Sequence, residues 1–293
     1  MPAVWIDHEA YARQRHKQCA FNLYVAAMLR HALAPIAGAL SDGRAAEHYV
    51  ELSQAIERAT VARFWDAARG LFVNNLPWLK EEGRPRLCDR SLATALLFDQ
   101  CPGGATTGSL RALAESPPEL GISYPANAVW RYRALAGLGR ADVVLAELRS
   151  RWATMESVLR NNTIQEFWRA RPDSADQWSH CAVAPLLLLF GGIAGVEPLA
   201  PGFARCRVRP QLGDLGRLAL TAHTVRGPIR FGAEPAGAGH DIMLKLPEGC
   251  AGELLLPAGA QANLPPIEIE RADGLFAFRV EPGATATCWM PRG

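Results

Sequence analysis

The sequence has little net charge and no cluster of basic residues. Its 31 Lys and Arg side chains are nearly balanced by 29 Asp and Glu, which leaves a formal net charge of +2 over 293 residues. A nucleic-acid-binding surface needs grouped Lys and Arg to displace the counterions of the phosphate backbone. The even balance therefore argues against a nucleic-acid partner.

The seven cysteines do not have the spacing of a metal site or a disulfide framework. Their number is odd and no two of them form a CxxC pair, whereas zinc ribbons and secreted disulfide scaffolds have close, paired cysteines. The first 17 residues also lack the apolar segment of a secretory signal peptide. We therefore expect free thiols and a cytoplasmic location.

No uncharged run is long enough to cross a bilayer. The longest covers residues 181–196 and contains Pro185, whereas a membrane helix needs roughly 20 apolar residues. We therefore predict no membrane partner and a buried helix over residues 179–193.

Several catalytic and cofactor motifs are missing. The segment GGATTGS at residues 103–109 lacks the lysine of a phosphate-binding P-loop, and the glycines at 191–192 follow a helical pattern rather than a strand. There is no HExxH zinc motif and no GxSxG nucleophile elbow. These absences give no support to P-loop, dinucleotide-binding, zincin or α/β-hydrolase chemistry.

The apolar pattern divides the chain into a helical part and a β part. With 49% apolar residues, both parts can form a core. About eight helices are predicted between residues 11 and 196, and their short connections favour antiparallel hairpins. After residue 198, short alternating runs separated by Gly and Pro predict about seven strands in an antiparallel β-sandwich. One predicted helical stripe consists of Phe21, Tyr24, Val25, Met28, Leu29 and Leu33.

The segment at residues 152–168, WATMESVLRNNTIQEFW, places a carboxylate among aromatic rings. Residues 161–164 have the composition of a loop, and Glu166 follows directly, beside Phe167 and Trp168. Sugar hydrolysis uses such a combination, because the rings stack on a pyranose and the carboxylate deprotonates a water. The alternative is that Glu166 favours the first turn of a helix, where the dipole attracts negative charge.

A second cluster lies at residues 176–180. Trp178 and His180 could bind a polyol through a ring face and a ring nitrogen. The alternative is a capped helix, with Asp176 or Ser179 as the N-cap and Trp178 as a hydrophobic staple.

Taken together and in this order, the segments resemble the bacterial α-L-rhamnosidases, which are six-hairpin glycosidases. Residues 162–166 are similar to the TTxWE-like segment that supplies the catalytic base in that family, with Asn162 in place of a Thr and Gln165 in place of a Trp. Residues 178–180, 184–185 and 195–199 resemble its last barrel helix, and segments between residues 201 and 215 resemble the start of its C-terminal β-domain. Residues 5–7 resemble its FIDW-type segment.

The resemblance implies both a fold and an activity. The fold would be a partial (α/α)6 toroid of antiparallel helical hairpins over residues 1–198, incomplete at its N-terminal side, followed by a β-sandwich over residues 199–293. The activity would be inverting hydrolysis of a terminal α-L-rhamnoside without a metal or cofactor. Glu166 would be the general base, and the sugar would be contacted by Asp7, Trp168, Trp178 and His180.

The family's general acid lies in a DxxxxER-like segment, of which the sequence has no convincing copy. An inverting glycosidase needs two carboxyl groups roughly 6.5–9.5 Å apart, and the available substitutes are Asp7, Glu9 and Asp89. We therefore expect a C-terminal fragment, and the sequence leaves open whether this chain alone hydrolyses a glycoside. The alternatives are a non-catalytic carbohydrate-binding or structural remnant, and one half of a split enzyme. An incomplete barrel would expose apolar faces that a second copy or a partner chain could cover.

Overall fold

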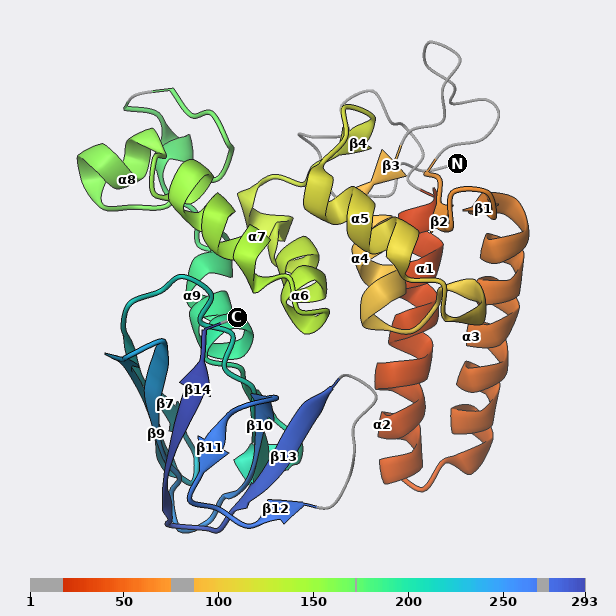
Figure 1. The fold of residues 1–293 in the computed structure, drawn as a ribbon. Helices are drawn as coiled ribbons and strands as arrows, with labels where there is room; N and C mark the ends of the chain where they lie inside the picture. Colours follow the sequence, from red (N-terminus) through yellow and green to blue (C-terminus); the bar gives the residue numbers. More distant parts are fainter. Residues whose placement is uncertain (1–17, 75–86, 172, 268–273, 293) are drawn as a thin grey trace. The chain divides into compact units, whose positions relative to one another are not determined.

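The computed structural model describes residues 18–74, 87–171, 173–267 and 274–292 (Figure 1). The chain divides into two compact units. The helical unit comprises Met1–Arg140 and Glu147–Ala184, and the β unit comprises Ala141–Ala146 and Pro185–Gly293. The predicted order of helices followed by mainly antiparallel sheets is confirmed. The predicted domain boundary at residue 198 stays a prediction.

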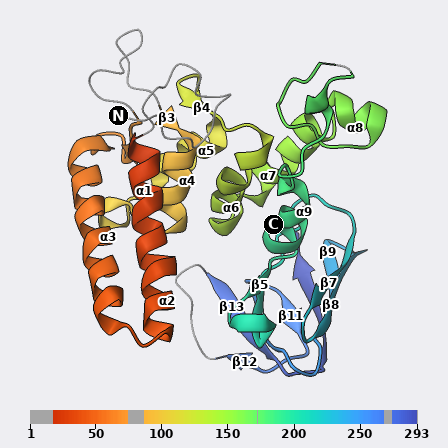
Figure 2. The same cartoon turned by 180° about the vertical axis from the view of Figure 1, so that it is seen from behind.

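The helical unit begins with a long helical hairpin. Its first arm runs without a break through α1 (Gln18–Met28), the π-helical turn η1 (Leu29–Leu33) and α2 (Ala34–Ala39). The second arm, α3 (Gly43–Phe64), lies antiparallel beside it in both views (Figures 1 and 2). Asp42 caps α3 by accepting a hydrogen bond from the Ala45 N–H at 3.0 Å, which satisfies one of the free donors at the helix start.

The first helix buries a different face from the predicted one. Phe21, Tyr24 and Met28 are 37%, 37% and 40% exposed, so this part of the predicted stripe is wrong. The buried face is lined instead by smaller residues: Cys19, Ala20, Leu23, Ala26 and Ala27. Because α1 packs against both α3 and α4 (Asp89–Leu97), small side chains on the shared face let the helices approach closely.

The same helical run is the one described segment that is long and apolar enough to span a membrane. By length and composition Cys19–Ala39 passes this test, and 39% of its apolar window is buried. A core helix of a soluble protein passes it too, and this run packs along α3. Its composition therefore assigns no membrane role.

The remaining helices are shorter. They are α4, α5 (Thr107–Glu115), α6 (Val129–Gly137), α7 (Ala141–Glu147) with its extension η4 (Leu148–Trp152), α8 (Glu156–Asn161), and α9 (Ala184–Leu188) with its extension η6 (Leu189–Ile193). Short 3-10 turns occur at η2 (Pro102–Gly104), η3 (Pro125–Asn127), η5 (Ala175–Gln177) and η7 (Pro201–Phe203). Two-residue strands form two small pairs, β1 (Trp65–Asp66) with β2 (Leu71–Phe72), and β3 (Leu87–Cys88) with β4 (Leu120–Gly121). Helix α4 is buried from Asp89 to Leu96 and packs against α1 and α6, so it is the central helix of this unit.

The last helix starts later than predicted. It begins at Ala184 rather than at residue 179, so the predicted helix is wrong for residues 179–183. Leu186 and Leu187 are exposed, whereas Leu188 and Ile193 are buried as predicted. Pro185 gives a physical reason for the late start, because proline has no N–H to donate and is best accommodated in the first turn of a helix.

The β unit contains two five-stranded sheets. Their strand orders are β12-β13-β10-β6-β5 and β11-β14-β9-β8-β7. The first sheet is built from β5 (Val196–Pro198), β6 (Arg205–Val208), β10 (Ala251–Pro257), β12 (Pro266–Ile267) and β13 (Leu275–Val280). The second is built from β7 (Leu218–Thr224), β8 (Gly227–Ala236), β9 (Gly239–Lys245), β11 (Gln261–Ala262) and β14 (Thr285–Pro291). Strands β6 and β10 pair in parallel, a departure from the all-antiparallel prediction, while the other described pairs of these two sheets are antiparallel.

One hydrophobic cluster joins the inner faces of both sheets. It includes Val208 and Leu254 from the first sheet, Phe231 and Leu244 from the second, and Ile193 from the end of η6. Strand β9 alternates strictly, with its even-numbered residues from His240 to Leu244 buried and the odd-numbered ones from residue 241 exposed. The outer face of the second sheet is therefore left for solvent or a ligand.

Candidate functional site

The two polar-aromatic segments that were predicted separately are joined in the structure. Three hydrogen bonds connect them: Glu166 N to Asp176 O at 2.9 Å, Ser179 N to Ile164 O at 2.9 Å, and Thr163 Oγ1 to Gln177 O at 2.7 Å. Two of these bonds are between backbone groups, so the segments run side by side without forming a regular sheet. Glu166 therefore lies on a loop whose neighbouring segment carries Trp178 and His180.

Gln165 fixes this loop from the inside. Its side chain is buried, Oε1 accepts a hydrogen bond from the Ser157 N–H at 3.2 Å, and Nε2 donates to the Phe167 carbonyl at 2.8 Å. Both ends of the amide are satisfied by backbone groups, as a buried polar side chain requires. Gln165, one of the two residues that depart from the family pattern, thus has a structural role next to Glu166.

Glu166 itself is half-buried and carries no charged partner. It lies outside any helix, so the alternative placement in a first helical turn is wrong. In the part of the chain that the structure describes, no hydrogen bond or ion pair engages its carboxylate, while its N–H is held by Asp176. The carboxylate is therefore available to hydrogen-bond a water or a substrate hydroxyl.

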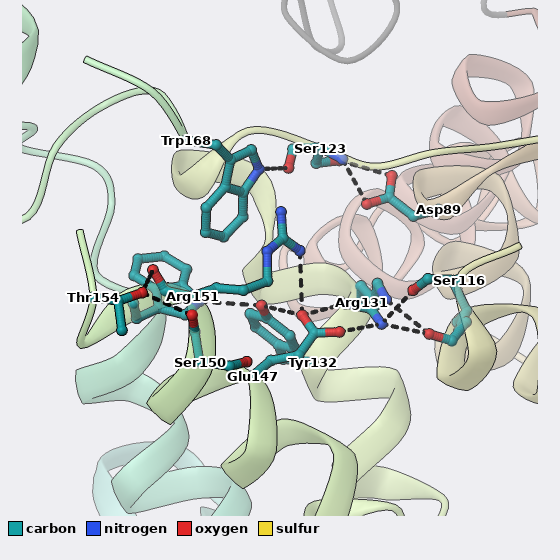
Figure 3. A network of polar contacts seen from close by, with 12 residues as sticks. Asp89, Ser116, Ser123, Arg131, Tyr132, Glu147, Ser150, Arg151, Thr154 and Trp168 are labelled. Atoms are coloured by element: carbon teal, nitrogen blue, oxygen red, sulfur yellow. Dashed lines mark hydrogen bonds and ion pairs between the residues drawn. The ribbon is translucent and has the colours of Figure 1, made fainter. Parts of the chain in front are cut away.

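Trp168 is held firmly beside the loop. Its Nε1–H donates to the Ser123 carbonyl at 2.8 Å, and the Trp152 and Trp168 rings pack edge-to-face with their centroids 5.2 Å apart. The guanidinium of Arg151 lies 3.8 Å from the Trp168 ring centroid, a cation–π contact that covers one face of the indole (Figure 3). Its role as a sugar contact stays a prediction.

The remaining predicted sugar contacts differ in placement. Trp178 is 62% exposed and His180 is also exposed, on a non-helical stretch that ends before α9. The capped-helix alternative for this stretch is wrong, because the helix starts only at Ala184. Exposed rings can meet a ligand, and the sugar-binding roles of both residues stay predictions. Asp7 lies outside the described residues.

The carboxylate of Asp89 is engaged in hydrogen bonds inside the helical unit. It is buried at the start of α4, and both of its oxygens accept hydrogen bonds from Ser123, from the N–H at 2.7 Å and from the hydroxyl at 2.8 Å. Because the Ser123 carbonyl accepts a hydrogen bond from Trp168, these bonds connect the central helix α4 to Trp168 (Figure 3). This geometry argues against Asp89 as a general acid, which must reach the leaving oxygen of a substrate.

A buried ion network supports the other side of Trp168. Arg131 is only 2% exposed and donates to both oxygens of Glu147, at 2.8 and 2.7 Å, and to the Leu113 carbonyl (Figure 3). Tyr132 and Arg151 also donate to Glu147, at 2.7 and 3.3 Å. Burial alone would raise the pKa of Glu147, but the hydrogen bonds and charge of Arg131, together with Tyr132 and Arg151, outweigh burial and hold that pKa below its ordinary value.

Neither this network nor Ser123 was predicted from the sequence. Arg131 and Tyr132 lie on α6, and Glu147 and Arg151 lie on α7 and its extension η4. They belong to no motif, so only the packing of these successive helices brings the side chains together. A stacked pair, Tyr124 and Phe167, with centroids 5.9 Å apart, connects the same loop to the segment after β4. Among the described residues, no group of three or more His, Cys, Asp or Glu side chains is arranged to hold a metal ion.

Comparison with known proteins gives one family match and several matches of fold. Residues 195–266 match the model of the bacterial α-L-rhamnosidase C-terminal domain. The Streptomyces avermitilis α-L-rhamnosidase, solved in complex with L-rhamnose, is similar over 91% of this chain and 26% of its own, at 18% identity and a TM-score of 0.70. The α-L-rhamnosidase of Dictyoglumus thermophilum covers 92% of this chain and 31% of its own, at 16% identity and a TM-score of 0.71.

The Aspergillus terreus α-L-rhamnosidase gives the same TM-score of 0.71 at 18% identity, over 98% of this chain and 33% of its own. No curated protein sequence matches the chain. The chain thus spans about a quarter to a third of these solved enzymes. Residues 195–266 therefore match the C-terminal domain of the bacterial α-L-rhamnosidases, and the rest of the chain is similar to these enzymes in fold.

Proposed function

We propose that this chain supplies the general base and part of the sugar-binding wall of an α-L-rhamnosidase-type glycoside hydrolase. In this proposal the helical unit is part of an (α/α)6 toroid, the β unit is a β-sandwich, and the domains meet near residue 198. Glu166 activates the water for inverting attack on a terminal α-L-rhamnoside. The observation that carries the proposal is the unpartnered Glu166 carboxylate on a loop that is anchored on both sides.

The anchoring matters because a general base acts only when it is fixed within hydrogen-bond reach of the proton it removes. The backbone bond from Glu166 to Asp176 and the buried amide of Gln165 hold the loop in place. The guanidinium of Arg151, which lies over Trp168, forms its ion pair with Glu147 and leaves the Glu166 carboxylate without a charged partner among the described residues. Glu166 would then accept the proton of a water as that water attacks the anomeric carbon opposite the leaving group.

The sugar contacts come from the surrounding rings and polar groups. Trp168 and Trp178 would meet the apolar face of the pyranose, and His180 and Asp7 would bind its hydroxyl groups. The exposure of Trp178 and the rigid setting of Trp168 support this arrangement. No metal or cofactor is part of the proposal.

The general acid is proposed to come from outside the described residues. Asp89 is buried and bonded to Ser123, so it is poorly placed for that role. We propose that a second copy or a partner chain covers the exposed side chains of α1 and completes the site, as in a split enzyme. The second candidate function, a non-catalytic carbohydrate-binding or structural remnant, is favoured by the same burial of Asp89.

An activated substrate separates the base from the missing acid. The leaving group of a dinitrophenyl α-L-rhamnoside departs without protonation, so a chain with only a base should still hydrolyse it. We expect turnover by the wild type and a loss of about 10²–10⁴-fold in Glu166→Gln. Glu156→Gln, a surface change on α8, is the matched control and should keep full activity. Equal turnover in wild type and Glu166→Gln would overturn the assignment of the base, and no turnover with retained L-rhamnose binding would favour the non-catalytic remnant.

A further inference from the structure

The outer face of the second sheet forms a trough that the proposed catalytic site does not use. The trough has a volume of about 1060 Å³ and is lined by side chains of all five strands, β7, β8, β9, β11 and β14. Ligand sites usually measure about 300–1,000 Å³, so there is room for more than one sugar ring. All of its lining residues belong to the β unit.

The middle of the trough contains a glycine, which has no side chain to fill the space above the sheet. Gly232 on β8 pairs with Met243 on β9, which pairs in turn with Thr287 on β14. These residues alternate with core residues such as Phe231 and Leu244, so they face away from the core. A Cβ on Gly232 would meet only the Met243 side chain, at 3.6 Å, so the backbone does not require a glycine there. The glycine leaves open space above the middle of the sheet.

One wall is a fixed indole ring. Trp289 donates from Nε1 to the Ala236 carbonyl at 3.0 Å. Its ring lies so close to Gly239 that a Cβ there would come within 2.7 Å of ring atoms. A ring fixed in this way loses little conformational entropy on binding and offers an apolar surface to a ligand.

The other lining groups supply both donors and acceptors. Arg230 can only donate hydrogen bonds and Asp241 can only accept them, and both are exposed. Asn263 Oδ1 already accepts from the Thr287 N–H at 3.2 Å, and within the described residues its amide nitrogen has no acceptor. A vicinal diol, in which each hydroxyl donates and accepts, matches this set of groups.

We propose that this trough is a second, non-catalytic carbohydrate site that binds a neutral oligosaccharide. An anionic ligand such as a phosphodiester gains little here, because Glu234 is paired with Arg217 at 2.7 Å and the charge of Arg230 is offset by Asp241, so the lining has no excess positive charge. A purely apolar ligand would leave these charges unsatisfied. An extended peptide adds to the edge of a sheet, whereas this site lies on its face. A neutral sugar chain satisfies both the ring and the polar groups.

The test is affinity electrophoresis of the full chain in gels that contain neutral polysaccharides, a rhamnan among them. Two variants address the trough: Trp289→Ala removes the wall, and Gly232→Leu fills the floor while Trp289 stays in place. Gly216→Leu, at a site in the same unit with no atom within 4 Å of a new Cβ, is the matched control. Thermal unfolding shows whether each variant is folded.

We expect at least one neutral polysaccharide to retard the wild type and Gly216→Leu equally. Both trough variants should bind at least tenfold more weakly. The inference rests on the proposed function only for the choice of rhamnan as a probe. Because the trough is separate from the proposed catalytic site, Gly232→Leu should hydrolyse the aryl rhamnoside at the wild-type rate. Retardation that Glu166→Gln abolishes but Gly232→Leu keeps would place binding at the helical unit and overturn the trough. A wild type that no neutral polysaccharide retards would overturn it as well.

Discussion

At the residue scale, the buried pair of Arg131 and Glu147 makes the sharpest prediction about stability. Glu147→Ala leaves Arg131 without its charged partner while the guanidinium stays buried, so we expect a loss of about 3–5 kcal/mol in unfolding free energy. Glu156→Ala breaks only an exposed pair with Arg160 and should cost less than about 1 kcal/mol. Urea unfolding of both variants measures the difference, and equal losses would contradict the role given to the network.

The same carboxylate predicts a pH dependence. The folded pKa of Glu147 lies below its unfolded value of about 4.3, so its contribution to stability is complete above that pH and is lost as pH falls through the folded pKa. Glu147→Gln has no such titration. Between about pH 6 and pH 3 the unfolding free energy of the wild type should therefore fall more steeply than that of the variant, and parallel curves would argue that Glu147 is not ionised in this network.

The cysteines divide sharply by accessibility. Cys181 is exposed and the other six thiols are buried and free. Burial raises the pKa of Cys101 to about 11 and that of Cys206 and Cys288 to about 12, so these groups form little thiolate at neutral pH. A thiol reagent at about pH 8 should label one residue in the native chain and seven after denaturation. Cys181→Ser should abolish the native label, and fast labelling of a second thiol would contradict the buried placement.

At the element scale, the junction between η6 and β5 depends on Gly195. Its φ is +71°, and a Cβ there would lie 2.0 Å from the Arg209 carbonyl oxygen, so any side chain both strains the turn and collides with the backbone. We expect Gly195→Ala to destabilise the protein by more than about 2 kcal/mol. Gly216→Ala, which meets no neighbour, should be nearly neutral, and similar melting temperatures for the two would contradict the close approach.

The positions of helices along the chain were predicted better than the side of each helix that is buried. Periodicity identified the helix that contains Phe21 and Met28, but it favoured the larger apolar side chains, while the fold buries the smaller ones next to Leu23. Packing against two neighbouring helices decides this face, and the sequence of one helix does not contain that information. The late start of α9 could have been predicted, because Pro185 already restricts where the helix begins.

At the scale of the whole molecule, the order of helices then sheets and the family resemblance could be predicted because they depend on local patterns and on residues 195–215. The site could be predicted only in part. Glu166 and Trp178 lie in short recognisable segments, whereas Ser123, Arg131 and Glu147 take part through side-chain contacts between separate elements of the fold. Such contacts leave no local pattern in a single sequence.

The central claim is that Glu166 is a general base, and rescue of Glu166→Ala by azide tests it most directly. Azide needs no deprotonation, so it can replace the activated water on the same face of the sugar. With a dinitrophenyl α-L-rhamnoside, we predict that azide restores turnover in Glu166→Ala, leaves the wild-type rate unchanged and yields the β-rhamnosyl azide. An inactive wild type, an active wild type without rescue of the variant, or an α-configured product would contradict the account.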